Sequence, residues 1–454
     1  MQEVKFIDLF AGIGGLRLGF EKAFKKLGYI PKCVMTSEIK PFALKVLEHN
    51  FSHDYFVGDI TKVKNEDIPN FDFLLGGFPC QPFSAGGKRL GFVDTRGTLF
   101  FEIERILEAK KPYGFILENV EGLVKHNLKH KTDKIGNTLK TILNKLAALG
   151  YQVQWKVLNA ADFGLPQDRK RVFIVGTRDA KVCLDEFAPK RKKIKSILEE
   201  GLPSISTKLS KLLLQHFTIE DLHGKSIKDK RGGDDNIHSW DIELKGSVSK
   251  EQAELLNKLF KERRKKHWAA EIGIDWMDGM TLTLNQIKTF HKSKNLKALL
   301  DDLVEKGYLK FEHPKSLVIE HTSSGLKSGR MENKKLKAGY NIVSGKLSFE
   351  INKILDPDGI APTLVATDME RIAVPNGKGL RKLTLREGLR LFGFPEWFEL
   401  PVKERDGFDL LGNTVPINVV EKVTERLAGI YLLRKESSTP EENSVNVFSN
   451  YEAG

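Results

Sequence analysis

The sequence has few cysteines for its length. There are three in 454 residues, Cys33, Cys80 and Cys183. They are far apart and include no Cys-x-x-Cys pair, so neither a disulfide framework nor a zinc site is supported. We therefore expect a protein of a reducing cytosol that carries no metal.

The sequence also lacks a long hydrophobic run. No apolar stretch approaches the roughly 20 residues needed to span a bilayer, and residues 1–5 do not have the layout of a signal peptide. We therefore expect a cytoplasmic protein without a membrane partner. Hydrophobic residues still make up 40% of the chain, which is enough for a sizeable core in two or three domains.

Negative charge is in short supply. The chain has 73 Lys and Arg against 60 Asp and Glu, a formal net charge of +13. Residues 181–360 contribute 34 Lys and Arg and 26 Asp and Glu, so most of the excess lies there. Such a balance indicates a polyanionic partner, most simply nucleic acid. The alternative is a merely basic soluble protein.

The N-terminal region begins with a strand-like run, Val4 to Phe10. It is followed by the glycine-rich turn at residues 11–15 and a helical pattern that closes at Gly28. Strand, glycine turn and helix open a doubly wound α/β domain. Arg17 stands where the dinucleotide fingerprint needs its third glycine. The turn therefore indicates a different nucleotide-like cofactor, or else a tight structural turn.

Acidic residues follow the next two expected strands. Glu38 comes about 20 residues beyond the glycine turn, a spacing at which an acid commonly binds ribose hydroxyls. Asp59 and Ile60 follow the third strand and could hold an adenine by a hydrogen bond and by packing. Each acid alone could be an ordinary helix cap. Together they predict one adenosyl pocket.

Cys80 lies just past the fourth expected strand, between two prolines at 79 and 82. A thiol at this rigid corner is either a nucleophile or a small hydrophobic residue that fills a gap. The loop at residues 85–91, with Lys88 and Arg89, is a candidate lid over a phosphate backbone.

Two later strand ends carry charged groups. Glu118 ends the next expected strand and should face the same crevice as Cys80, since ligands sit outside the carboxyl ends of the strands. Arg169 and Arg171 lie at the start of a further strand, and alternation would send both to one face. A solvated charge run is the alternative.

Five short sequence blocks follow one another along the chain. They are Phe10-Ala-Gly-Ile-Gly-Gly15, Pro79-Cys80-Gln81, Glu118-Asn119-Val120, Gln167-Asp-Arg169-Lys-Arg171 and Gly412-Asn413-Thr414-Val415. With these blocks the chain resembles the DNA (cytosine-5)-methyltransferases of bacterial type II restriction-modification systems, over residues 4–180 and 380–432. The resemblance implies an S-adenosylmethionine-dependent, Rossmann-like doubly wound sheet with an inserted, smaller target-recognition domain.

The resemblance also implies roles for individual residues. Cys80 would attack carbon 6 of a flipped cytosine, Glu118 would bind the ring nitrogen, Arg171 the base oxygen, and Arg169 would order the catalytic loop. Gly86 departs from relatives that carry a loop serine there. The implied contacts with S-adenosylmethionine are Phe10, Gly12, Gly14, Gly15, Glu38, Ile39, Asp59, Ile60, Pro79, Leu99, Asn413 and Val415. Those implied with DNA are Gln81, Ser84, Lys88 and Arg89.

The domain organisation follows from the same blocks. We expect a catalytic domain over residues 1–188, a target-recognition domain over 189–395, a returning segment over 396–435 and a flexible tail over 436–454. Helix, helix and strand near 249–312 predict a winged-helix-like insert, or a plain helical insertion. The polar, basic tract at 323–335 predicts a loop that contacts DNA, or a disordered surface loop.

Two rival functions remain at this point. One is an RNA cytosine-5 methyltransferase, which would have less use for the large basic insertion. The other is a catalytically inactive DNA-binding regulator, which would not need Cys80, Glu118 and Arg171. Adenine methylation is disfavoured, because the sequence has no Asp/Asn-Pro-Pro-Tyr/Phe tetrad. We expect a monomer that acts on double-stranded DNA beside a restriction endonuclease of the same specificity.

Overall fold

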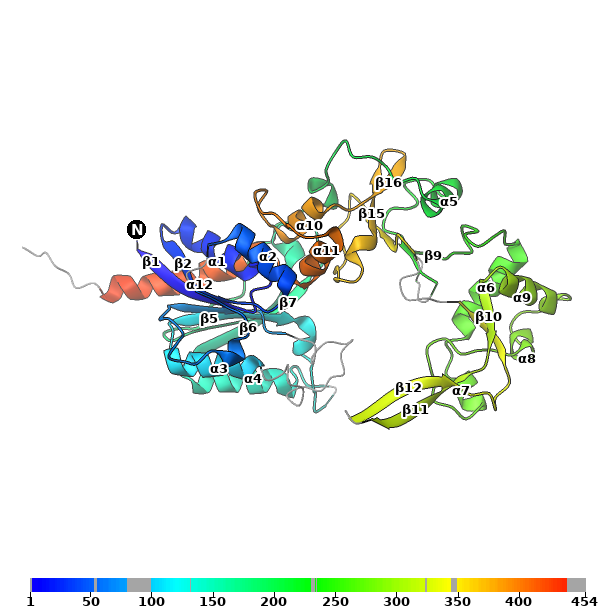
Figure 1. Cartoon of the computed structure of the whole chain (residues 1–454), viewed down its shortest axis with the longest axis horizontal. Helices are drawn as coiled ribbons and strands as arrows, with labels where there is room; N and C mark the ends of the chain where they lie inside the picture. The colour runs from blue at the N-terminus through cyan, green and yellow to red at the C-terminus, as the bar shows by residue number, and fades with distance from the viewer. Residues whose placement is uncertain are drawn as a thin grey trace, which may run out of the picture. The chain divides into compact units, whose positions relative to one another are not determined.

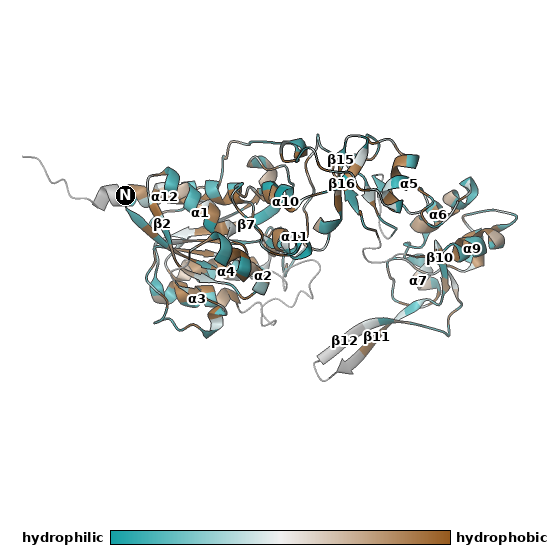
Figure 2. Ribbon diagram, turned by 45° about the horizontal axis from the view of Figure 1, so that its top comes forward, coloured by the Kyte–Doolittle hydropathy of each residue, from teal (hydrophilic) through white to brown (hydrophobic). Residues whose placement is uncertain are grey.

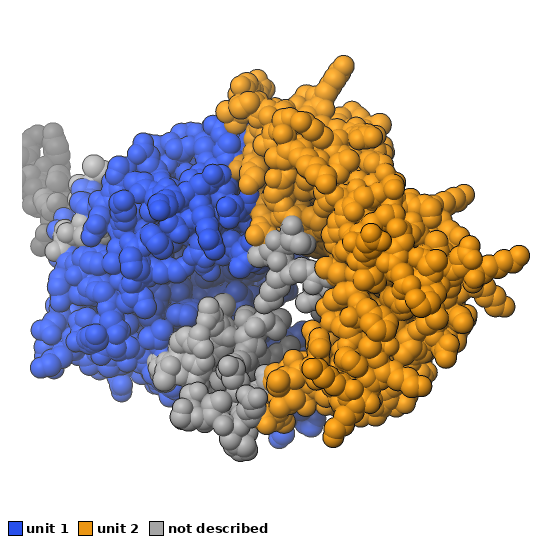
Figure 3. Space-filling model, turned by 45° about the vertical axis from the view of Figure 1, so that its right-hand side comes forward, with its two compact units in different colours: residues 1–199, 358–370, 384–454 blue, residues 200–357, 371–383 orange. Residues whose placement is uncertain are grey.

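The computed structural model describes residues 2–52, 55–79, 99–130, 132–229, 233, 235–322, 325–343 and 349–438. The chain divides into two compact units, and each is described by itself (Figures 1 and 3). Unit 1 comprises residues 1–199, 358–370 and 384–454, and unit 2 comprises residues 200–357 and 371–383.

The unit boundaries differ from the expected domain boundaries at 188 and 395. A buried acid, Glu387, links both differing segments within unit 1. It accepts a hydrogen bond from the backbone amide of Glu199 at 2.7 Å and one from that of Thr384 at 2.9 Å. Residues 189–199 and 384–395 therefore belong with the first unit rather than with the second.

Unit 1 is built on a seven-stranded sheet of order β3-β2-β1-β4-β5-β7-β6. Strands β1 to β5 are parallel, and β7 is antiparallel to both of its neighbours. The carboxyl ends of the parallel strands and the amino end of β7 therefore meet at one edge. The strand order reverses between β1 and β4, where such folds bind ligands. The expected doubly wound α/β fold is confirmed. The strands are β1 (Glu3–Leu9), β2 (Ile30–Ser37), β3 (Phe56–Val57), β4 (Phe73–Gly76), β5 (Gly114–Val120), β6 (Gln152–Asn159) and β7 (Lys170–Thr177).

Helices cover both faces of this sheet (Figure 1). Helices α1 (Gly15–Lys26) and α12 (Ile417–Ser438) pack on one face, and α3 (Leu99–Lys110) and α4 (Asn137–Ala148) on the other. Hydrophobic residues gather on the central strands and on the helix sides that face them (Figure 2). No helix in the described part of the chain is both long and apolar enough to cross a membrane. The other α-helices of unit 1 are α2 (Pro41–Asn50), α10 (Leu385–Phe392) and α11 (Glu404–Asn413).

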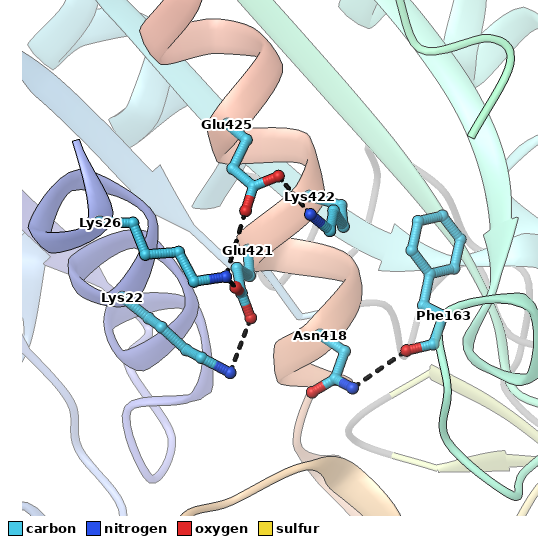
Figure 4. A network of polar contacts seen from close by, with 7 residues as sticks. All are labelled: Lys22, Lys26, Phe163, Asn418, Glu421, Lys422 and Glu425. Atoms are coloured by element: carbon cyan, nitrogen blue, oxygen red, sulfur yellow. Dashed lines mark hydrogen bonds and ion pairs between the residues drawn. The ribbon is translucent and has the colours of Figure 1, made fainter. Parts of the chain in front are cut away.

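Ion pairs between one buried acid and two half-exposed lysines fasten the C-terminal helix α12 to α1 (Figure 4). Glu421 is 4% exposed, and its carboxylate lies 2.8 Å from the ammonium of Lys22 and also pairs with Lys26. On the same helix, the Asn418 amide donates to the carbonyl of Phe163 at 3.0 Å. These contacts hold the end of the chain against its beginning.

Unit 2 contains a five-stranded sheet of order β16-β15-β14-β8-β9. Helix α5 (Lys208–His216) packs against it through Leu209 and Leu213, both buried in the same hydrophobic core. The strands are β8 (Ser226–Ile227), β9 (Asn236–Ile237), β14 (Lys353–Ile354), β15 (Ile372–Asn376) and β16 (Gly379–Lys382).

The rest of unit 2 is a helical cluster with its own hydrophobic core. Residue Leu282 pairs with Tyr340 of β13, and β10 pairs with β13 on the other side. Two helices, a single bridge, two further helices, a strand, a hairpin and a strand follow one another past the expected limit at 312, and the choice between a winged-helix-like insert and a plain helical insertion stays open. The elements are α6 (Lys250–Glu262), α7 (His267–Glu271), α8 (Leu284–Lys288), α9 (Leu296–Glu305), β10 (Leu309–Glu312), β11 (Lys315–Thr322), β12 (Gly325–Glu332) and β13 (Gly339–Ile342).

The polar tract at 323–335 is only partly the loop that was predicted. Its residues from Gly325 to Glu332 form β12, which pairs with β11 from Lys315–Glu332 to Thr322–Gly325. Polar composition misled the prediction, because backbone pairing with β11 satisfies the amides of β12 whatever side chains it carries.

Candidate active site

The glycine turn after β1 lies at the ligand-binding edge of the sheet. Gly12 has a φ of +56°, and a side chain placed there would meet open space. Gly15 is needed for a different reason, because an added Cβ would lie 2.8 Å from the side chain of Val415. The C-terminal block with Asn413 and Val415 is thus brought to the glycine turn, as the resemblance implied.

Glu38 is held in place at the end of β2. One carboxylate oxygen accepts from the backbone amide of Gly12 at 2.7 Å, and the other accepts from the amides of Ile39 and Lys40, both at 2.8 Å. The acid therefore ties the second strand end to the glycine turn. The neighbouring Ile39 side chain is 69% exposed at this edge.

Asp59 follows β3 and acts as a cap. Its carboxylate accepts from the amide and the hydroxyl of Thr61 at 3.1 and 2.7 Å. These hydrogen bonds lower the pKa of Asp59. Ile60 is only 2% exposed and packs in the core beneath, so the exposed apolar surface at this edge comes from Ile39 rather than from Ile60.

Glu118 and Arg171 meet where β5 ends and β7 begins. In the antiparallel register Val120 lies opposite Arg171, so the arginine is one diagonal step from Glu118 on the same face. The Arg171 guanidinium lies 3.0 Å from the Glu118 carboxylate, and both side chains are almost buried. Burial raises the pKa of Glu118, although Arg171 and Arg169 act to lower it.

Asn119, beside Glu118, reaches the strand end that leads to the predicted nucleophile. Its amide donates to the carbonyl of Phe78 at 3.1 Å. It therefore fixes the backbone one residue before Pro79. The sequence alone assigned Asn119 no role beyond its place in the Glu118-Asn119-Val120 block.

Arg169 and Arg171 have different partners, although the alternation of side chains along a strand would place both on the same face. Arg169 is 1% exposed, and its guanidinium donates to the carbonyls of Leu364, Gly412 and Thr414 at 2.8–3.0 Å. It joins the start of β7 to two distant segments of unit 1. These bonds hold Arg169 against the backbone of both segments, and its effect on the catalytic loop stays a prediction.

A buried acid that the sequence analysis missed lies in β1. Asp8 is fully buried, and neither carboxylate oxygen has a hydrogen-bond partner among the described residues. Burial raises its pKa to about 7 despite the nearby Arg17. Arg17 itself pairs with Glu21 at 2.7 Å. A charged residue inside an apolar strand run was the available signal.

A small cavity opens beside Arg171. Its volume is ≈ 320 Å³. Arg171, which pairs with Glu118, is one of its lining residues. Its lining comprises Val120, Glu121, Gly122, Asp168, Lys170, Arg171 and Thr363.

Several predicted site residues lie outside the part of the chain that the structure describes. They are Cys80, Gln81, Ser84, Lys88 and Arg89, together with the departure at Gly86. Pro79 and Leu99, both predicted cofactor residues, flank this segment. Within the described residues, no group of three or more His, Cys, Asp or Glu is arranged to hold a metal ion.

Comparisons with known proteins agree with this geometry. A family model described as C-5 cytosine-specific DNA methylase matches residues 4–429. Type II methyltransferase M.NlaIV of Neisseria lactamica is 58% identical over 427 residues, which cover 94% of this chain and 99% of the relative. M.NgoBV of Neisseria gonorrhoeae is 56% identical with the same coverage. Among solved structures, the Entamoeba histolytica methyltransferase EhMeth shares the fold, with a TM-score of 0.52 at 17% identity over 95% of this chain and 99% of that one. The chain therefore belongs to the C-5 cytosine-specific DNA methylase family.

Proposed function

We propose that this protein methylates carbon 5 of a cytosine within a specific site of double-stranded DNA, with S-adenosylmethionine as donor and Cys80 as nucleophile. The observation that carries the proposal is the buried Glu118–Arg171 pair at the ligand-binding edge. Asn119 fixes the backbone beside that pair, one residue before the Pro79-Cys80 corner. The family membership agrees with this chemistry.

The glycine edge fits the proposed cofactor. Open space at Gly12, the anchored carboxylate of Glu38 and the exposed side chain of Ile39 suit a ribose and an adenine ring. When bound, S-adenosylmethionine supplies a methyl group on a positively charged sulfur. Gly12, Glu38 and Ile39 would bind and orient it, while Val415 closes the turn from the C-terminal side.

Cys80 would make carbon 5 reactive. A free thiol has a pKa of about 8.5 and is only slightly ionised at neutral pH. Its thiolate would bond to carbon 6 as the ring double bond opens and the ring nitrogen gains a proton, and carbon 5 would bond the methyl carbon as the methyl–sulfonium bond breaks and S-adenosylhomocysteine leaves. A base would then remove the carbon 5 proton, those electrons would restore the ring double bond as the carbon 6–sulfur bond breaks, and the ring nitrogen would return its proton to the acid that supplied it.

Glu118 would supply the ring proton. Burial raises its pKa, so the carboxyl group holds a proton at higher pH than an exposed glutamate does. Arg171 would bind the base oxygen and stabilise the charge that develops there. The cavity lined by Arg171 offers room beside its guanidinium.

The target base must leave the helix for this geometry to be used. Extrusion of a base costs a few kcal/mol, which contacts of the protein with the DNA would offset. We further propose that the protein acts as a cytoplasmic monomer and shields its site from a restriction endonuclease of the same specificity.

Covalent trapping tests the proposal. The protein should form a stable adduct with methylatable duplex DNA that contains 5-fluorocytosine, because fluorine cannot leave as a proton does. Peptide mapping should find the adduct on Cys80, and Cys80→Ser should form none. Trapping at another residue, or methyl incorporation into transfer RNA in place of duplex DNA, would overturn the assignment.

A further inference from the structure

The turn between α8 and α9, in the helical cluster of unit 2, gathers polar groups that the proposed reaction does not use. A cavity of ≈ 420 Å³ lies against this turn. The residues that line it are Lys288, His291, Lys292, Ser293 and Lys294.

The three lysines of this turn are exposed, and none forms an ion pair with another described residue. Other lysines of the same cluster do have partners. Lys258 pairs with Glu254 at 2.6 Å, and Lys306 pairs with Asp302 at 2.7 Å. The turn therefore keeps a local excess of positive charge.

His291 provides an independent sign of a ligand. It is 4% exposed, yet neither ring nitrogen has a hydrogen-bond partner in the described part of the chain. The nearest carboxylate oxygen, from Glu251, is 4.0 Å from Nε2, which is too far for a hydrogen bond. A buried polar group without a partner is costly, and a ligand oxygen in the cavity would supply one.

The same turn leads into the amino end of α9. This ten-residue helix has no acidic residue in its first turn, and its cap, Asn295, makes no side-chain hydrogen bond. The unpaired amides and the helix dipole favour an anion there. Further along, the helix carries Asp301, Asp302 and Glu305, so its flank suits DNA less well than its end does.

We propose that the α8–α9 turn, residues 288–295, binds a backbone phosphate of the substrate DNA. The inference rests on the proposed function and names a contact that holds the duplex without reading its sequence. Lysine ammonium groups and helix amides bind phosphate as a charge rather than distinguish bases. The amino end of α9 would contact the DNA backbone. The first helix of a helix-turn-helix pair also contacts the backbone, but with its side.

Salt dependence of DNA binding tests this contact. The variant K288A/K292A/K294A should lose at least about tenfold in affinity near physiological salt, equally on specific and unrelated duplexes. The slope of log affinity against log salt should become shallower by about 0.9 for each phosphate contact removed. The matched control K258A/K265A/K306A removes the same charge from lysines that have carboxylate partners, and it should change the slope much less.

A second variant separates binding from folding. His291→Phe keeps the buried ring but removes both nitrogens, so it should weaken DNA binding while the melting temperature stays close to that of the parent. A lower melting temperature with unchanged DNA affinity would mean that His291 is only a packing residue. That result would overturn its place in the site.

The outcomes distinguish this inference from the proposed function. If the parent protein methylates duplex DNA and both triple variants show the same salt slope, the phosphate contact is wrong and the proposed function stands. If the three lysines govern binding of inorganic phosphate but not of DNA, the site takes a free anion and the DNA assignment falls. If the parent forms no adduct with fluorinated DNA, the proposed function itself fails.

Discussion

Two sites, one in each unit, place their charged groups in opposite ways. At the sheet edge of unit 1, Glu118, Arg171 and Arg169 are nearly buried, and each has a defined partner. In the α8–α9 turn of unit 2, Lys292 and Lys294 are exposed and have no carboxylate partner among the described residues. Buried pairs act at short range and resist salt, whereas exposed unpaired charges act at a distance and are screened by it. The first arrangement suits the making of bonds, and the second suits the capture of a polyanion.

The largest expected effect comes from the acid in the buried pair. Glu118→Gln keeps the shape but removes the transferable proton, so methyl transfer should slow by roughly 10²–10⁴-fold. Single-turnover rates at saturating DNA measure this loss. The slope of DNA affinity against salt should not change, because no exposed charge is removed. A variant with normal rates and weakened DNA binding would break the comparison between the two units.

The pH profile of the parent protein sharpens the same point. Burial raises the pKa of Glu118, so its protonated form persists to higher pH than in an exposed glutamate. The single-turnover rate should therefore decline as pH rises through that pKa. Ionisation of Cys80 acts in the opposite direction, and the pH profile of Glu118→Gln, which keeps Cys80, measures that second effect alone. A decline of the same shape in the variant would show that another group is responsible.

Arg169 should matter for stability more than for chemistry. Arg169→Met leaves three buried carbonyls without their donor and should lower the free energy of unfolding by about 3 kcal/mol or more. Denaturant titration measures the loss. Arg191→Met is the control, since Arg191 is 80% exposed and pairs weakly at 3.4 Å. Equal losses in the two variants would contradict the structural role of Arg169.

Asp8 should make stability depend on pH. Its folded pKa is raised to about 7, whereas an unfolded aspartate titrates near about 3.9. Between these two pKa values the folded state binds a proton that the unfolded state has released. The free energy of unfolding therefore falls as pH rises across this interval. The free energy of unfolding of Asp8→Asn, relative to that of the parent, should rise by about 2–3 kcal/mol between pH 5 and pH 7.5. Asp67→Asn, at an exposed site, should show no such trend.

The smallest effect concerns the ion pairs that fasten α12. Burial alone would raise the pKa of Glu421, but Lys22 and Lys26 hold it below its usual value. Glu421→Gln should lower stability by about 1 kcal/mol near pH 7, as seen by thermal melting. The gap should close as pH falls through the folded pKa of Glu421, where the parent loses its charge. A gap that is constant down to pH 3 would rule out the ion pair as its source.

The sequence predicted where three acids of unit 1 would lie, for a physical reason. Glu38, Asp59 and Glu118 each follow an apolar run, and parallel strands bring such ends to one edge of a sheet. It could not predict that β7 runs antiparallel and so brings Arg171 opposite Val120, because strand pairing depends on contacts far along the chain. The capping hydrogen bonds of Asp59 were open for the same reason, since a cap and a cofactor contact both suit an acid at a strand end, and its cofactor contact stays a prediction.

Other features lay beyond what pattern alone can give. Alternation assigns Arg169 to a face of a strand, but its three carbonyl partners come from segments about 200 residues away. Asp8 was passed over because a single acid hardly alters an apolar run. In unit 2 the apolar stripes predicted the helices. The polar side chains of β12 gave no strand pattern, because backbone pairing with β11 holds this strand in place.

The contact between Gly15 and Val415 sets a condition on how the protein is made. The first turn to leave the ribosome is completed by a residue that emerges some 400 positions later. A chain still on the ribosome therefore lacks this contact until residue 415 has emerged, so the glycine turn reaches its final packing only late in synthesis.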